Sequence, residues 1–180
     1  MANAVSATNS PAINIGGGST ELVVGTNEKL ETAVKIPFGA KFILKTFGAH
    51  NNIDWEKLDE YLAAEIVIPP VKAKDIFITG VLDIVTTMKD NIPAETDSCS
   101  FKDHPISFTL PHYIEYIEKL RATPLEQIKS YYPKNPTFCD GYTVGLSVYL
   151  ACAKKLGVER VIPSNNDLTD GIVYEMTKTI

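Results

Sequence analysis

One short segment of the 180-residue chain carries the residue types that could bind an anion: Gly16-Gly17-Gly18-Ser19-Thr20-Glu21. Glycines permit a positive φ and let the backbone approach a ligand closely, because no Cβ intervenes. Successive N–H groups in such a turn bind anions, and the hydroxyls of Ser19 and Thr20 add donors. The Glu21 carboxylate would take Mg²⁺ directly or through water. The segment therefore suits a Mg²⁺–phosphate group, with a plain glycine hairpin and a solvent-facing Glu21 as the alternative.

The elements around this segment predict an antiparallel start to the domain. Residues 1–11 are rich in Ala, Asn and Ser and are expected to form a flexible N-terminal tail. Alternating or continuous apolar runs predict strands at residues 12–15, 21–24 and 30–37. A single domain over residues 12–180 follows from the chain length.

Helices and two more strands follow. Asp54 is placed to cap a helix that begins at Trp55, and Thr123 to open a capping box with Glu126. The remaining elements are a strand at 76–78, helices at 81–89, 113–120, 141–156 and from 168, a loop at 90–107 and a strand at 160–162. Gly157 is expected to end the helix over 141–156. The order predicts an α/β fold, a mixed five-stranded sheet flanked by helices, in the ribonuclease-H-like arrangement.

The composition excludes several classes of protein. Hydrophobic residues make up 44% and charged residues 22%, which is a globular balance. The net charge of −5 and the lack of a Lys/Arg block predict no nucleic-acid partner. No membrane-spanning stretch or signal peptide is evident, so we expect a cytoplasmic protein. Cys99, Cys139 and Cys152 lack metal-site spacing and are expected to be free thiols.

The glycine segment resembles a known family signature. Residues 13–22, INIGGGSTEL, are similar to the D-I-G-G-G-S-T-E-L motif of the exopolyphosphatase/guanosine pentaphosphate phosphatase family (Ppx/GppA), where it opens the second of two actin-like domains. Weaker similarity continues in family order, so that the resemblance spans about residues 12–176, with matching segments at 36–40, 78–80, 145–164 and 168–174.

The resemblance implies a fold, a substrate class and a set of site residues. It implies an actin-like ATPase domain, ribonuclease-H-like in fold, that is half of a two-domain hydrolase of polyphosphate or guanosine pentaphosphate. It implies Mg²⁺ or another divalent cation as cofactor, held by Glu21 and Asn14. The phosphate ligands that it implies are Gly16, Gly17, Gly18, Ser19, Thr20 and Gly80. Partners would be polyphosphate or guanosine polyphosphate and the first domain, with a homodimer left open; Asp140 is a weaker candidate for the ligand cleft.

The sequence also departs from the family pattern. Asn14 stands where the family has an aspartate, and an amide contributes no negative charge to a Mg²⁺ site. Phe42, Lys45, Val81 and Thr169-Asp170 replace other polar family positions. The first domain, with its own phosphate loop and the carboxylate that activates water, is not expected upstream of Ala12. Catalytic residues are therefore not assigned.

These departures leave three hypotheses. The chain is the second domain of such a hydrolase, nearly inert without the first, because phosphoryl transfer needs charge neutralisation from several directions. Alternatively it is a degenerate, non-catalytic module that binds polyphosphate or nucleotides. A half of another actin-like ATPase, such as a sugar kinase or chaperone, is the third hypothesis, and the glycine motif argues against it.

Overall fold

The described chain forms one mixed sheet covered on one face by helices. The computed structural model describes residues 10–25, 29–71, 73–79, 107–133 and 136–164. The sheet has six strands in the order β3-β2-β1-β4-β6-β5. Their bounds are β1 Ala12–Ile15, β2 Thr20–Gly25, β3 Leu30–Ile36, β4 Asp75–Thr79, β5 Phe108–Thr109 and β6 Arg160–Pro163. The strands β1, β4 and β6 are parallel, whereas β2, β3 and β5 pair antiparallel to their neighbours.

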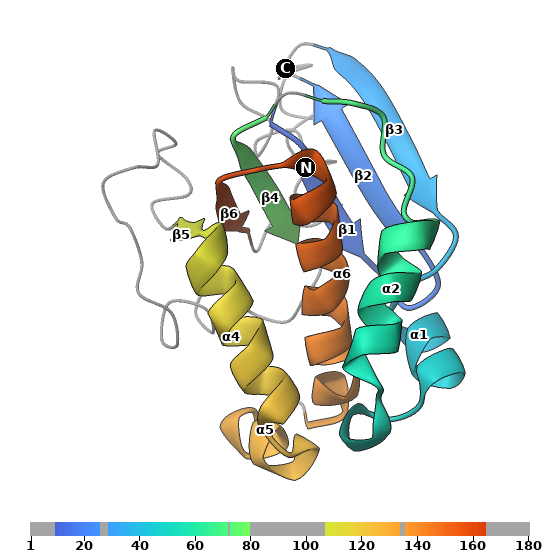
Figure 1. The fold of residues 1–180 in the computed structure, drawn as a ribbon, viewed down its shortest axis with the longest axis vertical. Coiled ribbons are helices and arrows are strands. Elements are labelled where there is room, and N and C mark those ends of the chain that lie inside the picture. The colour runs from blue at the N-terminus through green and yellow to red at the C-terminus, as the bar shows by residue number, and fades with distance from the viewer. Residues whose placement is uncertain (1–9, 26–28, 72, 80–106, 134–135, 165–180) are drawn as a thin grey trace, which may run out of the picture.

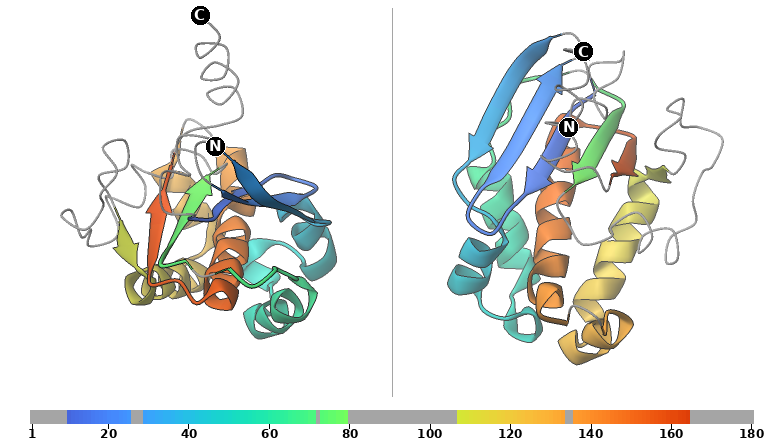
Figure 2. Two further views of the ribbon diagram at one scale, coloured as in Figure 1. Left: turned by 90° about the horizontal axis from the view of Figure 1, so that it is seen from above. Right: turned by 180° about the vertical axis from the view of Figure 1, so that it is seen from behind.

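The described helices lie on one face of the sheet (Figures 1 and 2). Their bounds are α1 Ala40–Phe47, η1 His50–Asn52, α2 Trp55–Glu65, α4 Leu110–Ala122, α5 Leu125–Tyr131, η2 Pro136–Gly141 and α6 Tyr142–Leu156. The helix α6 lies between α4 and α2 and packs across the middle of the sheet (Figure 1). It is buried on nearly every side, as its apolar composition requires. Gly157 ends it with φ 65°, a left-handed conformation that favours glycine.

A mixed sheet with flanking helices confirms the predicted fold class, and two details of the prediction are wrong. The sheet has a sixth strand, β5, because Phe108 and Thr109, which follow the predicted loop over 90–107, pair with β6. The helix α1 was not predicted at all; its N-cap residue Gly39 has no side chain to signal a start. The predicted helices over 81–89 and from 168 lie outside the described residues.

Helix termini show where sequence signals held. Asp54 caps α2 as predicted, its side chain accepting a hydrogen bond from the N–H of Lys57 at 3.2 Å. The predicted capping box at Thr123 is wrong: its hydroxyl donates to the carbonyl of Lys119, and Thr123 closes α4. Of the predicted tail, Pro11 is buried, and its carbonyl accepts a hydrogen bond from the N–H of Phe77.

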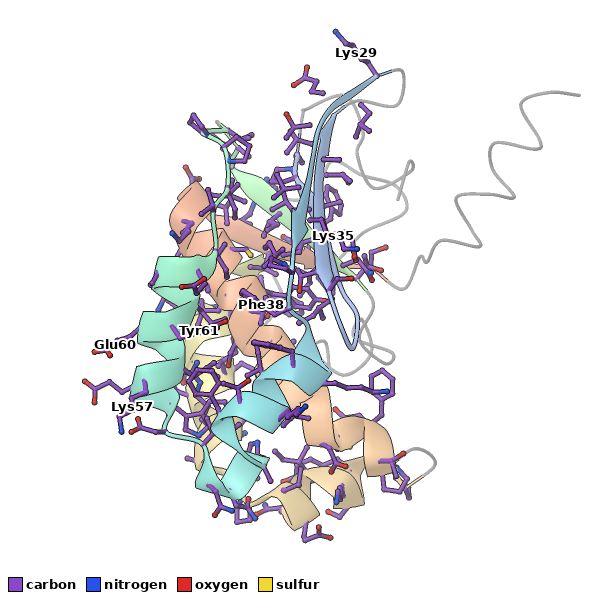
Figure 3. The ribbon with its side chains drawn as sticks, turned by 90° about the vertical axis from the view of Figure 1, so that its right-hand side faces the viewer. Lys29, Lys35, Phe38, Lys57, Glu60 and Tyr61 are labelled. Carbon is purple, nitrogen blue, oxygen red and sulfur yellow. The ribbon has the colours of Figure 1, made fainter. Side chains whose placement is uncertain are left out.

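Aromatic side chains join the end of β3 to the helices. Phe38 follows β3 and points toward Tyr61 of α2, their ring centroids 5.6 Å apart (Figure 3). Phe47 of α1 lies 5.1 Å from the same tyrosine ring. Lys57 and Glu60 point away from the domain on the outer side of α2 (Figure 3). This cluster fixes the junction between β3 and α1, and thereby the start of α1.

Candidate functional site: a glycine loop beside a cleft

The glycine loop connects β1 to β2 and lies against the start of α1. The N–H groups of Ala40 and Lys41 donate to the carbonyls of Gly16 and Gly17, at 3.0 and 2.9 Å. These two bonds satisfy N–H groups that every helix start leaves without an intrahelical partner. The loop therefore caps α1 through its backbone, in place of the capping side chain that Gly39 lacks.

Close approach, and not positive φ, explains the glycine at position 39. Among the described glycines only Gly48 and Gly157 have positive φ, so Gly16, Gly17 and Gly18 do not use the positive φ that glycine permits. A Cβ on Gly39 would lie 2.2 Å from the carbonyl oxygen of Gly16. Only glycine at position 39 lets α1 approach the loop this closely.

The loop also has donors that face no internal acceptor. Within residues 10–25 and the other described segments, the N–H groups of Gly17 and Gly18 make no hydrogen bond to the protein. The carbonyls of Gly16 and Gly17 are bonded to α1 instead. Because these two carbonyl oxygens already accept hydrogen bonds from α1, the loop offers free N–H donors and fewer free acceptors. This arrangement favours the binding of an anion.

Thr20 and Gly80 are the predicted phosphate ligands that the structure does not place at the loop surface. Thr20 is fully buried, and its hydroxyl donates to the carbonyl of Phe38 at 2.9 Å. Its side chain thus ties the loop to the β3–α1 junction. Gly80 lies outside the described residues; Thr79 before it ends β4 and pairs in register with Asn14 of β1.

The two predicted metal ligands face each other across the β1–β2 ladder, where Asn14 and Glu21 are register partners. The Asn14 Nδ2 group donates to Glu21 Oε2 at 3.3 Å, and the Ser19 hydroxyl donates to Glu21 Oε1 at 2.5 Å. Both carboxylate oxygens therefore have an internal donor. A divalent cation prefers oxygen ligands, and here the amide presents nitrogen to the carboxylate. As arranged, these residues do not fit a metal site.

A cleft of about 500 Å³ opens beside the loop. Its lining comes from the loop and β1 (Ile15, Gly16, Gly17), from α1 (Ala40, Lys41, Leu44), from η2 (Thr137, Phe138, Asp140, Gly141) and from α6 (Tyr142, Gly145). Gly141 brings η2 close to α1, since a Cβ there would lie 3.2 Å from that of Ala40. The cleft thus depends on the same close packing at α1 as the loop.

Two charged residues stand at this cleft. Lys41 is exposed, and its aliphatic stem lies over Gly17, where an added Cβ would be 3.0 Å from Lys41 Cδ. Asp140, expected as a weaker candidate, does line the cleft, but it is paired with Lys129 at 3.1 Å. Hydrogen bonding to Asp140 raises the pKa of Lys129. Lys41 therefore lines the cleft as a cation, and no carboxylate of the described residues forms an ion pair with it.

Sequence reasoning missed Lys41 and Tyr149. Lys41 could have been found from its place directly after the Gly39-Ala40 segment that follows β3. The Tyr149 hydroxyl accepts a hydrogen bond from the N–H of Ile15 at 3.2 Å and donates to the carbonyl of Thr79. It thereby joins the carboxyl ends of β1 and β4 from α6, and no local pattern marks it. By contrast, Phe42, a noted departure, stacks on Phe38 and does not line the cleft.

Comparison with known proteins agrees with this fold and loop. A sequence model of the Ppx/GppA phosphatase family matches residues 2–180. No curated protein sequence matches. In the described part of the chain, no helix is long and apolar enough to cross a membrane.

Solved structures share the fold at low identity. A Ppx/GppA family member from Aquifex aeolicus superposes with a TM-score of 0.79 at 17% identity, over 96% of this chain and 57% of that one. An exopolyphosphatase from Cytophaga hutchinsonii gives 0.76 at 16% identity, over 98% and 59%. An exopolyphosphatase-like protein gives 0.69 at 16% identity, over 95% and 60%.

The chain thus spans less than two thirds of the length of these structures, which agrees with its predicted placement as the second of two actin-like domains. The family match decides against a half of a sugar kinase or chaperone. A glycine loop at the β1–β2 turn, a mixed sheet in this order and a match over almost the whole sequence lead to one assignment: the chain belongs to the Ppx/GppA phosphatase family.

Proposed function

We propose that this chain is the phosphate-binding domain of a phosphoanhydride hydrolase that acts on polyphosphate or guanosine polyphosphate. The observation that carries the proposal is the glycine loop itself. In the described structure, the N–H groups of Gly17 and Gly18 have no internal acceptor beside a cleft that also holds Lys41. Gly17 and Lys41 both line this cleft, and a backbone donor beside a cation suits a terminal phosphate group.

Hydrolysis is proposed to need groups that this domain does not supply by itself. Family relatives are longer, since the chain covers 57% and 59% of two of them. Phosphoryl transfer depends on positioning and on charge neutralisation around the phosphate. In our proposal Glu21 holds the loop through Asn14 and Ser19 and is not the base that activates water. We therefore expect the isolated chain to bind phosphoanhydrides with little turnover.

A non-catalytic binding module is the second candidate. Asn14 favours it, because the amide replaces the family's aspartate and engages Glu21 directly. The two candidates differ once a first domain is supplied. A hydrolase domain would then release phosphate from polyphosphate or guanosine pentaphosphate, whereas a binding module would bind without release.

Both candidate functions require phosphate binding at the glycine loop, and calorimetry with tripolyphosphate tests this binding. Lys41→Gln removes the cation of the cleft, and we expect it to weaken binding about five- to tenfold, the effect of about 1 kcal/mol for a partly solvated charged contact. Lys45→Gln is the matched control, because Lys45 lies one turn further along α1 and does not line the cleft. Equal losses in both variants, or no binding by the unmodified chain, would count against the loop as the site.

We further propose a reducing, cytoplasmic setting. Cys139 and Cys152 are free, buried thiols, as predicted, and Cys99 lies outside the described residues. Burial raises the pKa of both. Neither is poised for disulfide exchange, since the thiolate is the reactive form.

A further inference from the structure

Each oxygen of the Glu21 carboxylate accepts a hydrogen bond from a neutral donor of its own chain. One oxygen accepts from the Ser19 hydroxyl at 2.5 Å and the other from the Asn14 amide at 3.3 Å. All three side chains are partly buried. Asn14 and Glu21 are register partners at the facing ends of β1 and β2, so the ladder holds them together, and Ser19 lies in the loop directly before β2.

The orientation of the Asn14 amide follows from its neighbour. A carboxylate only accepts hydrogen bonds, so the NH₂ group of Asn14, and not its oxygen, must face Glu21. Coordination of a cation between the two residues would require the amide to turn over, so that its oxygen takes the place of the NH₂ group beside Glu21. The turned amide would still carry no charge, leaving Glu21 as the one anion of the pair.

We propose that the Asn14 amide takes the place of a divalent cation beside Glu21, so that the glycine loop of this chain binds a phosphate group without a metal ion. This inference rests on the proposed function. The loop keeps its shape through the Asn14–Glu21 and Ser19–Glu21 bonds and through the capping of α1. The phosphate charge meets the loop N–H groups and Lys41 instead of Mg²⁺.

The substitution Asn14→Asp should reverse the arrangement. It puts two carboxylates directly opposite each other across an antiparallel pair, where like charges repel. A divalent cation between them would relieve the repulsion. We therefore expect N14D to melt below the unmodified chain, to regain that stability with Mn²⁺, and to show a saturable Mn²⁺ site that the unmodified chain lacks.

The test measures metal and phosphate separately on the full 180-residue chain. Electron paramagnetic resonance of free Mn²⁺ reports metal binding with and without pyrophosphate. Calorimetry in EDTA reports binding of pyrophosphate alone. N14D is the variant expected to gain metal, and Glu21→Gln keeps the shape of the side chain while removing its charge.

The expected result is pyrophosphate binding in EDTA and no saturable Mn²⁺ site in the unmodified chain. A stoichiometric Mn²⁺ site that disappears in E21Q would overturn the inference. Pyrophosphate binding that requires Mn²⁺ would also overturn it while leaving the proposed function intact. If pyrophosphate fails to bind with or without Mn²⁺, the proposed function itself fails.

Discussion

Replacing Gly39 by alanine tests whether the glycine loop and α1 form one packed unit. The added Cβ would lie 2.2 Å from the Gly16 carbonyl oxygen, 2.9 Å from the Gly17 carbonyl carbon and 2.9 Å from the Ser19 nitrogen. All three are backbone atoms, so no flexible side chain can move aside. Gly39 has φ −139°, an extended conformation open to any residue, so the cost is steric alone.

The magnitude follows from overpacking and from the bonds that the clash would break. Inserting a carbon into a packed site costs about 1–3 kcal/mol. Moving α1 away weakens two hydrogen bonds, from Ala40 to Gly16 and from Lys41 to Gly17, each contributing about 0.5–1.5 kcal/mol. A loss of about 3 kcal/mol in unfolding free energy corresponds to a Tm lower by roughly 6–12 °C in a chain of this size.

Urea denaturation followed by circular dichroism measures the loss, with tripolyphosphate calorimetry on the folded variant alongside. Gly18→Ala is the matched control, because a Cβ there would meet nothing within 4 Å and its φ is not positive. We expect G18A to stay within about 1 kcal/mol of the unmodified chain. A G39A variant as stable as G18A, with unchanged binding, would refute the idea that this contact positions the loop.

Four further substitutions have definite expectations. Tyr149→Phe leaves the buried N–H of Ile15 without its 3.2 Å acceptor, so we expect a loss of about 1–3 kcal/mol in urea denaturation; a neutral variant would contradict this. The Arg121 side chain is 5% exposed and bonds to both oxygens of Asp59, at 2.6 and 2.8 Å. Its guanidinium lies 5.0 Å from the centre of the Trp55 ring. Arg121→Ala should therefore lower the unfolding free energy by about 2–4 kcal/mol. Asp59→Asn should cost less, because the Asp59 carboxyl is 42% exposed and Arg121 keeps its bonds to Glu118 and Ser147; a larger loss for Asp59→Asn would contradict this. Burial raises the pKa of the Cys152 thiol from 9.0 to about 12. Between these two values the thiol is deprotonated in the unfolded chain but still protonated in the folded one. The unfolding free energy should therefore fall as the pH rises, by up to about 1.4 kcal/mol per pH unit. Cys152→Ala should flatten that part of the slope in urea midpoints measured between about pH 8 and pH 11.

Apolar periodicity and capping residues predicted those elements whose start, end and buried face are determined by their own residues. The apolar runs of β1, β4 and β6 and the amphipathic helix α4 needed no knowledge of their neighbours, and Asp54 marked the start of α2 by its own side chain. The helix α1 gave no such signal, because its first N–H groups are satisfied by the carbonyls of Gly16 and Gly17, more than twenty residues earlier. The two residues of β5 form a strand only because β6 lies beside them.

The candidate site likewise has a part that could be predicted from local sequence and a part that depends on the fold. The glycine loop is contiguous in sequence and could be identified from its residue types, but the contacts that its side chains make depend on the fold. Thr20 is turned into the protein, to the Phe38 carbonyl, because it is the buried position of its strand pair. Lys41 and Asp140 meet at one cleft only through the packing of α1 against η2.

The order of the strands has a consequence for how the chain is made. The centre of the sheet is β1-β4-β6, and β6 ends at Pro163. A ribosome must therefore synthesise about 138 residues after β2 ends at Gly25 before β4 gains its second neighbour. At about 5–20 residues per second this takes roughly 7–28 s, during which the β1–β2 hairpin lacks the completed sheet beside it. Newly made chains of this domain should depend on chaperones during that interval, more than a fold that closes sequentially would.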